Sequence, residues 1–252
     1  MKKLLALLAL LTLAASISIT SWQSKPANFE AQAQRATGAI FVMGRFNCSG
    51  TEIGKTPTGN GVFLTARHCV ADPETDKINE QMEVTFSANE GGPFYLARPL
   101  AISSTDDLAL LELYNGADIP MVPIKAQWSL RSGDSIFNVS YPLGTGKEVF
   151  HGEFIQGRFP LLPADYLSQM PTWTYSMPVN LTIAHGSSGS GVFSSKERAL
   201  IGVAVGTFEE GSYNLAIPSD RVLYFLNHLQ DSTVEKFKQA HPEHVAPDEW
   251  PF

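Results

Sequence analysis

Short apolar runs separated by glycine and proline constrain this chain's fold more than any other feature. The 252 residues include 20 Gly and 16 Pro. Apolar runs such as residues 62–65, 108–113 and 200–205 recur between them at nearly regular spacing. Short strands punctuated by turn residues are typical of antiparallel barrels and sandwiches. We therefore expect an all-β protein.

One helix is expected near the C-terminal end, and little helix before it. Val222, Leu223 and Leu226 have helical spacing. Ser219 and Asp220, just before them, are candidate N-caps. At the other end, residues 36–46 are expected to form the opening strand.

The first residues have the layout of an export signal. Lys2 and Lys3 precede an apolar run over residues 4–15, and small residues follow it. This pattern predicts a secretory signal peptide over residues 1–24. Ser18, Thr20 and the later Ala-Gln-Ala at 31–33 are candidate cleavage points. We expect a periplasmic or extracellular protein that meets the membrane only transiently, with an uncleaved anchor as the alternative.

Composition narrows the partners. Lys and Arg number 18 against 25 Asp and Glu, which gives a formal net charge of −7. No basic stripe is visible, so nucleic acid is not expected as a partner. With 10% aromatic and 17% charged residues, the chain is not mostly disordered. We expect no cofactor and no metal ion.

Cys48 and Cys69 are the only two cysteines. Export would take them to an oxidising compartment, where disulfides persist. Only one intramolecular pairing is then possible. Two free buried thiols are the alternative.

Three local motifs carry side chains suited to nucleophilic catalysis. His68 ends the apolar strand around Thr65-Ala66-Arg67, Asp107 opens the apolar run 108–111, and Ser188 lies in the Gly/Ser-rich segment 185–191. A serine hydroxyl is a weak nucleophile that needs a base, and imidazole can take and return its proton. A carboxylate on the other ring nitrogen fixes the tautomer. His68, Asp107 and Ser188 are therefore candidate catalytic residues.

Two neighbouring residues refine this hypothesis. Gly186 has no side chain, so the backbone N–H groups of Gly186 and Ser188 can both point at a developing oxyanion. Asp106 competes with Asp107 for the role beside His68. Adjacent strand residues face opposite sides, and Asp107 directly precedes the apolar run, so Asp107 is favoured.

Together these blocks resemble the chymotrypsin/trypsin-like serine protease family, in the form of a bacterial exported trypsin-like peptidase. The residues that carry the resemblance are Cys48-Ser49-Gly50, Gly59-x-Gly61-Val62-Phe63-Leu64-Thr65-Ala66-x-His68-Cys69, Asp107-Leu108-Ala109-Leu110-Leu111 and Gly186-x-Ser188-Gly189-Ser190. The resemblance implies a Cys48–Cys69 disulfide and two six-stranded antiparallel β-barrels with the site between them, followed by a C-terminal α-helix. The predicted organisation is a protease domain over 36–240 (barrels at about 36–122 and 123–218, helix 219–238) and a tail over 241–252.

The resemblance also places a substrate pocket and exposes two departures. The resemblance puts the pocket floor at Thr182, with His185 nearby, and the pocket wall at the strand of Ala204, Val205 and Gly206. Thr182 is not acidic, which disfavours Arg or Lys at the cleaved position and predicts an apolar or small P1 residue. Digestive members of the family carry Asp where this chain has Ser187, so activation by a salt bridge to a new N-terminus is not expected.

The function predicted from these residues is an exported serine endopeptidase that hydrolyses polypeptide substrates through an acyl-enzyme. The alternative is a catalytically inactive relative that binds peptides or a partner in the cleft between the barrels.

Overall fold

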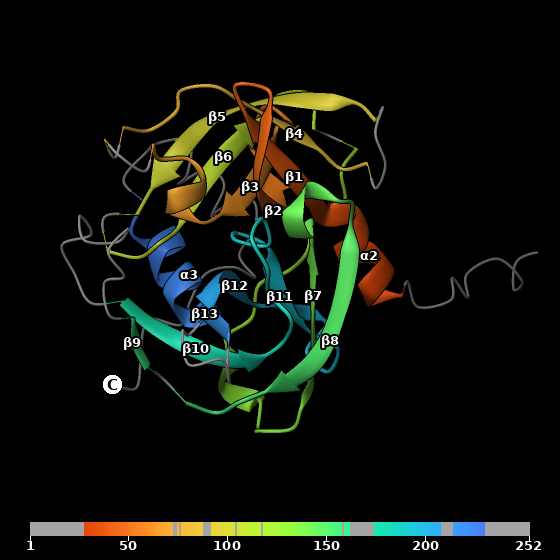
Figure 1. Cartoon of the computed structure of the whole chain (residues 1–252), viewed down its shortest axis with the longest axis vertical. Coiled ribbons are helices and arrows are strands. Elements are labelled where there is room, and N and C mark those ends of the chain that lie inside the picture. Colours follow the sequence, from red (N-terminus) through yellow and green to blue (C-terminus); the bar gives the residue numbers. More distant parts are fainter. Residues whose placement is uncertain are drawn as a thin grey trace, which may run out of the picture.

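The computed structural model describes residues 28–72, 75, 77–87, 92–103, 105–116, 118–157, 159–161, 174–207 and 214–229. These residues form two antiparallel β-barrels, drawn one above the other in Figure 1. This confirms the predicted all-β fold of two barrels. The predicted signal peptide and the predicted tail both lie outside the described residues.

Six strands close the first barrel. Their order is β1-β2-β3-β6-β5-β4, and pairing between β1 and β4 completes the circle. The strands are β1 (Thr37–Val42), β2 (Arg45–Lys55), β3 (Gly61–Thr65), β4 (Met82–Thr85), β5 (Phe94–Ile102) and β6 (Ala109–Leu113).

The second barrel follows the same plan. Its order is β13-β12-β11-β7-β8-β10, closed by pairing between β10 and β13, and the short strand β9 adds to β10. The strands are β7 (Ser135–Ser140), β8 (Glu148–Phe154), β9 (Phe159–Leu161), β10 (Thr174–Asn180), β11 (Gly191–Ser194), β12 (Ala199–Thr207) and β13 (Asn214–Pro218).

The apolar core runs from the first barrel into the junction between the barrels. Every residue of β3 and β6 is buried, and Phe63 pairs with Leu111 across them. The same buried cluster includes Phe137 of β7 and Phe193 of β11. Because β3 and β6 are covered on both faces, their sequences are mostly apolar rather than alternating, with Glu112 as the one charged residue. A separate apolar cluster, which includes Ile136, fills the interior of the second barrel.

The chain between the barrels contacts both of them. The Val122 N–H donates to the carbonyl of Glu52 (3.1 Å), and Ile124 bridges to Leu200 of β12. A 3₁₀ turn, η2 (Gln127–Ser129), follows before β7 begins. The predicted division near residues 122 and 123 falls within this connection.

A short helix precedes the first strand, in keeping with the expectation of little helix before the C-terminal one. Helix α2 covers Phe29–Ala36, a stretch the sequence analysis had not assigned to a helix. The Asn28 side chain caps it by accepting from the Glu30 N–H (3.1 Å). Phe29 packs edge-on against Phe137 and Phe193, with ring centroids 6.0 and 6.1 Å away.

The second helix, α3, covers Ser219–Asn227 and packs against β12 and β13. Pro218 is its N-cap residue, so the predicted capping by Ser219 or Asp220 was wrong. Ser219 Oγ instead donates to the carbonyl of Lys125 (2.6 Å). The described helix ends at Asn227, and residues 230–238 of the predicted helix lie outside the described part of the chain. Among the described residues, no helix is both long and apolar enough to cross a membrane.

Candidate active site

His68 lies in a 3₁₀ turn, η1 (Arg67–Cys69), directly after β3. A disulfide joins Cys69 to Cys48 of β2, as the sequence predicted. The Asn47 side chain also donates to the carbonyl of Cys69 (2.6 Å). The turn that carries His68 is thus fixed to β2 by a covalent bond and a hydrogen bond.

Asp107 precedes β6 and meets His68 at two points. His68 Nδ1 lies 2.6 Å from Asp107 Oδ2, and the His68 backbone N–H donates to Asp107 Oδ1 (2.9 Å). Asp107 is buried, whereas the side chain of His68 is 28% exposed. The carboxylate therefore fixes the imidazole from the protein interior and leaves part of the ring open to solvent.

The two groups shift each other's titration. Burial by itself lowers the pKa of His68, but the charge of Asp107 and the hydrogen bond to it prevail, so that pKa is raised above its usual 6.5. Burial by itself raises the pKa of Asp107. The charge of His68 and the hydrogen bonds from His68 and the Arg67 backbone outweigh burial, so the pKa of Asp107 is lowered.

Asp106 does not meet His68. Its carboxylate binds Arg221 of α3, with 2.9 Å to Nε and 2.8 Å to Nη2. The structure thus pairs Asp107, and not its neighbour, with His68.

Ser188 lies in a tight loop between β10 and β11. Inside the loop, the Ser187 N–H donates to Ala184 O (2.9 Å) and the Ser190 N–H to Ser187 O (3.1 Å). From the first barrel, the Ser49 N–H donates to Ser188 O (2.9 Å). The loop is therefore held both by its own turns and by β2.

Gly189 brings this loop against the residues that lead to His68. Its φ is +81°, and a Cβ built on it would lie 2.1 Å from Thr65 Oγ1 and 2.9 Å from the Ala66 N. Only glycine has both this backbone conformation and this close approach without strain. The chain around Ser188 and the chain before His68 are thus in direct contact.

Gly186 is required for the same two reasons. Its φ is +86°, and an added Cβ would lie 2.5 Å from the ring of Phe46 and 2.8 Å from Tyr141 O. Ser49 Oγ donates to Gly186 O (2.7 Å) and accepts from the Tyr141 N–H (3.0 Å). Among the described residues, the N–H groups of Gly186 and Ser188 donate to no acceptor.

Hydroxyl groups surround Ser187 where the digestive enzymes carry Asp. Ser187 is buried, and its Oγ accepts from Ser140 Oγ (3.1 Å) and from the Ala184 N–H (3.3 Å). Ser190 Oγ donates to Ser187 O (2.5 Å) and accepts from the Asn138 side chain (2.7 Å). Hydrogen bonds between uncharged groups therefore hold the Ser188 loop in place at Ser187 and Ser190.

The predicted substrate-pocket residues divide into two groups. Ala204 exchanges backbone hydrogen bonds with the Ser188 loop: its carbonyl accepts from Gly189 (2.7 Å), and its N–H donates to Ser190 (2.9 Å). Val205 and Gly206 continue β12 from there. Thr182 and His185 are exposed, and within the described residues no hydrogen bond joins them to this strand.

Sequence reasoning missed three residues of the site. Ser49 bridges Gly186 and Tyr141, Phe46 covers Gly186, and Arg221 binds Asp106. Each comes from a segment far from its partner in the chain. Ser49 belongs to the Cys48-Ser49-Gly50 motif, but no local pattern indicated these contacts in advance.

The sequence matches a known family over the region that holds this geometry. The trypsin-like peptidase domain family covers residues 48–203, which include His68, Asp107 and Ser188. The chain belongs to this family, which confirms the resemblance found in the sequence. A peptidase domain implies polypeptide substrates. No curated protein matches the chain significantly.

Solved structures share the fold. The HtrA-type protease AlgW with a decapeptide superposes with a TM-score of 0.63 and 18% identity, over 79% of this chain and 65% of that chain. Deg5 superposes with a TM-score of 0.60 and 22% identity, over 78% of this chain and 90% of that chain. The active form of the Rv3671c protease from M. tuberculosis superposes with a TM-score of 0.64 and 16% identity, over 81% of this chain and 85% of that chain. This chain spans less than two thirds of AlgW. At these identities the likeness establishes the fold alone.

Proposed function

We propose that this protein is an exported serine endopeptidase, with Ser188 as nucleophile, His68 as general base and Asp107 as the residue that orients His68. One observation carries the proposal. His68, hydrogen-bonded to Asp107, follows Thr65 and Ala66, which contact the Ser188 loop at Gly189. In that loop two backbone N–H groups have no acceptor among the described residues.

The proposed reaction proceeds in two halves. Ser188 Oγ attacks the peptide carbonyl carbon while its proton passes to Nε2 of His68. The N–H groups of Gly186 and Ser188 stabilise the oxyanion that forms. His68 then gives the proton to the leaving amine, which departs and leaves an ester on Ser188.

Water completes the cycle. His68 takes a proton from the water that attacks the ester, and returns it to Ser188 Oγ as the acid product leaves. Because Asp107 binds Nδ1, Nε2 is the nitrogen that exchanges protons throughout. Apart from the peptide substrate and this one water molecule, the steps need no further group to balance.

A fluorophosphonate probe, which reacts with activated serines, tests the assignment. We expect the probe to label the wild-type protein at Ser188, located by mass spectrometry of the labelled peptide, and to leave Ser188→Ala unlabelled. Ser129→Ala, which changes an exposed serine on η2, serves as the matched control and keeps full labelling. A folded but unlabelled wild-type protein would overturn the proposal and favour the peptide-binding alternative.

For the substrate we propose an apolar or small P1 residue. Support comes from the uncharged Thr182 and from the apolar Ala204 and Val205 of β12. Cleavage of a peptide library by the unlabelled wild-type protein measures this preference. A profile dominated by Arg, Lys or Glu at P1 contradicts it.

Export to the periplasm or the medium is the remaining part of the proposal. Its support is the sequence of residues 1–24. Fractionation of a bacterial host that expresses the full chain, with N-terminal sequencing of the product, tests it. An unprocessed chain in the cytoplasm would refute export.

A further inference from the structure

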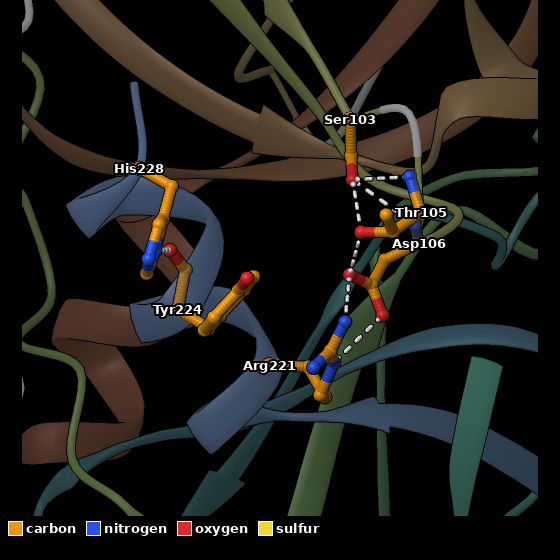
Figure 2. Close-up of polar contacts among 6 residues, drawn as sticks. All are labelled: Ser103, Thr105, Asp106, Arg221, Tyr224 and His228. Carbon is orange, nitrogen blue, oxygen red and sulfur yellow. Dashed lines mark hydrogen bonds and ion pairs between the residues drawn. The ribbon is translucent and has the colours of Figure 1, made fainter. Parts of the chain in front are cut away.

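Asp106 and Arg221 form a paired contact beside the candidate active site (Figure 2). Both carboxylate oxygens of Asp106 bind the guanidinium group. Asp106 is fully buried, and the Arg221 side chain is 23% exposed. Such a two-point contact fixes direction as well as charge. It ties α3 to the residue next to Asp107.

The turn that contains Asp107 is closed around Asp106. Ser103 Oγ accepts from the N–H groups of Thr105 (3.2 Å) and Asp106 (3.0 Å). Thr105 Oγ1 donates to the Asp106 carboxylate (2.8 Å). The Leu108 N–H donates to Asp106 O (2.8 Å), a bond that spans Asp107. The orientation of Asp107 therefore follows the position of Asp106.

Arg221 is braced from its own helix. Its guanidinium lies 4.7 Å from the ring centroid of Tyr224, and that ring stacks on His228 with centroids 3.9 Å apart. His228 Nδ1 lies 2.8 Å from the Tyr224 carbonyl oxygen, which is one turn back along α3 (Figure 2). The guanidinium therefore contacts the Tyr224 ring as well as Asp106.

We propose that Arg221 is a positioning residue for the His68–Asp107 pair. It holds Asp106, and through the turn it sets the orientation of Asp107 against His68. It also neutralises Asp106, so that Asp107 supplies the negative charge that acts on His68. The kinetic part of this inference rests on the proposed peptidase function.

The effect of replacing Asp106 or Arg221 on the titration of His68 depends on the other charged groups nearby. Asp106 and Asp107 lie on the turn, and Arg67 and His68 lie on η1. Arg221 and Asp220 lie on α3, where Asp220 also acts on Arg221 and accepts from Gln127.

Arg221→Gln leaves the negative charge of Asp106 unbalanced, which favours protonated His68. Asp106→Asn leaves the positive charge of Arg221 unbalanced, which disfavours it. The two changes therefore act on His68 in opposite directions.

Titration of the His68 ring nitrogens by NMR tests this without any need for turnover. We expect the titration midpoint to rise in Arg221→Gln, to fall in Asp106→Asn, and to return toward wild type in the double variant. A merely structural pair would lower stability in both single variants without opposite shifts. Identical midpoints in wild type and both single variants would overturn the proposal.

Kinetics supply the second readout. In Arg221→Gln we expect kcat to fall on the order of tenfold to a hundredfold with KM little changed, because the reacting groups lose their alignment. Arg221→Lys keeps the charge but lacks the planar two-point geometry of the guanidinium, so we expect it to keep the wild-type midpoint and to recover part of kcat. If Arg221→Gln does not fold, Arg221→Lys and Asp106→Asn carry the test, and wild-type kcat in both would overturn the proposal.

The first barrel provides a matched control. Arg98 Nε and Nη2 bind Glu112 Oε2 at 3.0 and 2.7 Å, between β5 and β6. We expect Arg98→Gln and Glu112→Gln to leave the His68 midpoint and kcat unchanged. A wild-type protein with neither turnover nor probe labelling would refute the peptidase function, while the NMR titration would still decide the role of Arg221.

Discussion

One hydrogen bond decides how the imidazole of His68 works. Asp107 binds Nδ1 at 2.6 Å, which assigns proton exchange to Nε2 and stabilises the ring when it is charged. The same contact raises the pKa of His68. The contact that would prepare His68 for its proposed role as base therefore also raises the pH below which the ring is protonated.

The pH profile follows from this direction. His68 must be neutral to act as base, so activity is lost as pH falls through its raised pKa. We expect Asp107→Asn to reduce kcat on the order of 10⁴-fold. For the wild-type protein we expect the acid limb of kcat/KM to have its midpoint above about pH 6.5. A rate profile between about pH 5 and pH 8 measures the limb. A flat profile would contradict the role of His68.

Gly186 gives a second prediction at this scale. Gly186→Ala strains a backbone with φ of +86° and drives a Cβ into Phe46 and Tyr141, which displaces the N–H that would face the oxyanion. We expect kcat to fall about 10²- to 10³-fold, as measured on a peptide ester or amide.

Gly133 is the matched control for that change. Its φ is +90°, but a Cβ there meets nothing within 4 Å. Gly133→Ala should therefore cost roughly 1–2 kcal/mol of stability and leave kcat intact. Equal kcat in the two variants would mean that Gly186 matters only for folding.

Helix α2, which the sequence pattern did not predict, contributes to the stability of the fold through Phe29. Phe29 is 7% exposed and contacts both Phe137 and Phe193. We expect Phe29→Ala to lower the free energy of unfolding by about 3–5 kcal/mol. Denaturant unfolding measures this loss.

Leu96 on β5, which is 42% exposed, offers a control for Phe29. Leu96→Ala should change stability by about 0.5 kcal/mol or less. Equal losses for the two variants would show that α2 does not stabilise the fold.

The contact of Phe29 with Phe137 and Phe193 also bears on signal-peptide cleavage. Cleavage after Ala33 would remove Phe29 from the protein, whereas cleavage at the earlier candidate points would keep it.

Local patterns predicted the parts of the fold and site that are encoded locally. The largely apolar runs at 62–65 and 108–113 fall on strands β3 and β6, because strands buried on both faces need a largely apolar sequence. Helix α2 was missed because it is only eight residues long and Phe29 is its one large apolar residue. A helix of that length depends on tertiary packing for most of its stability, and the packing of Phe29 is not visible in the sequence.

Contacts across the chain were beyond the sequence patterns for a similar reason. Ser49 and Gly186 are 137 residues apart, and Asp106 and Arg221 are 115 residues apart. Each side chain alone is ordinary for its strand, turn or helix. Only the docking of the two barrels and α3 gives it a partner.

At the scale of the whole molecule, Glu52 couples the fold to pH. It is fully buried in β2, and Lys55 Nζ lies 2.7 Å from its Oε1. Burial raises the pKa of Glu52 to about 8, even though Lys55 and the Val62 backbone act to lower it. Lys55 also donates to the carbonyls of Gly116 and Ile119, in the chain that leads to the second barrel.

The sign of the effect follows from proton binding. Between the ordinary pKa of 4.5 and about 8, folded Glu52 holds a proton that the unfolded chain releases. Its contribution to stability is thus fully present below 4.5 and is lost as pH rises through about 8.

We expect wild-type stability to fall relative to that of Glu52→Gln as pH rises, by at most about 1.4 kcal/mol per pH unit. Denaturant unfolding of both proteins between about pH 5 and pH 8 measures the difference. Parallel stability curves would show that Glu52 does not titrate in this range.

The strand β2 belongs to the first barrel, yet it holds the Ser188 loop of the second. Ser49 binds both Ser188 O and Gly186 O, and the Gly191 N–H donates to Thr51 Oγ1 (3.0 Å). These contacts exist only after the two halves have docked. A chain still emerging or half folded therefore lacks the ordered loop that peptide cleavage requires. We therefore expect the proposed protease to be unable to cleave other proteins, or itself, before both barrels have folded and docked.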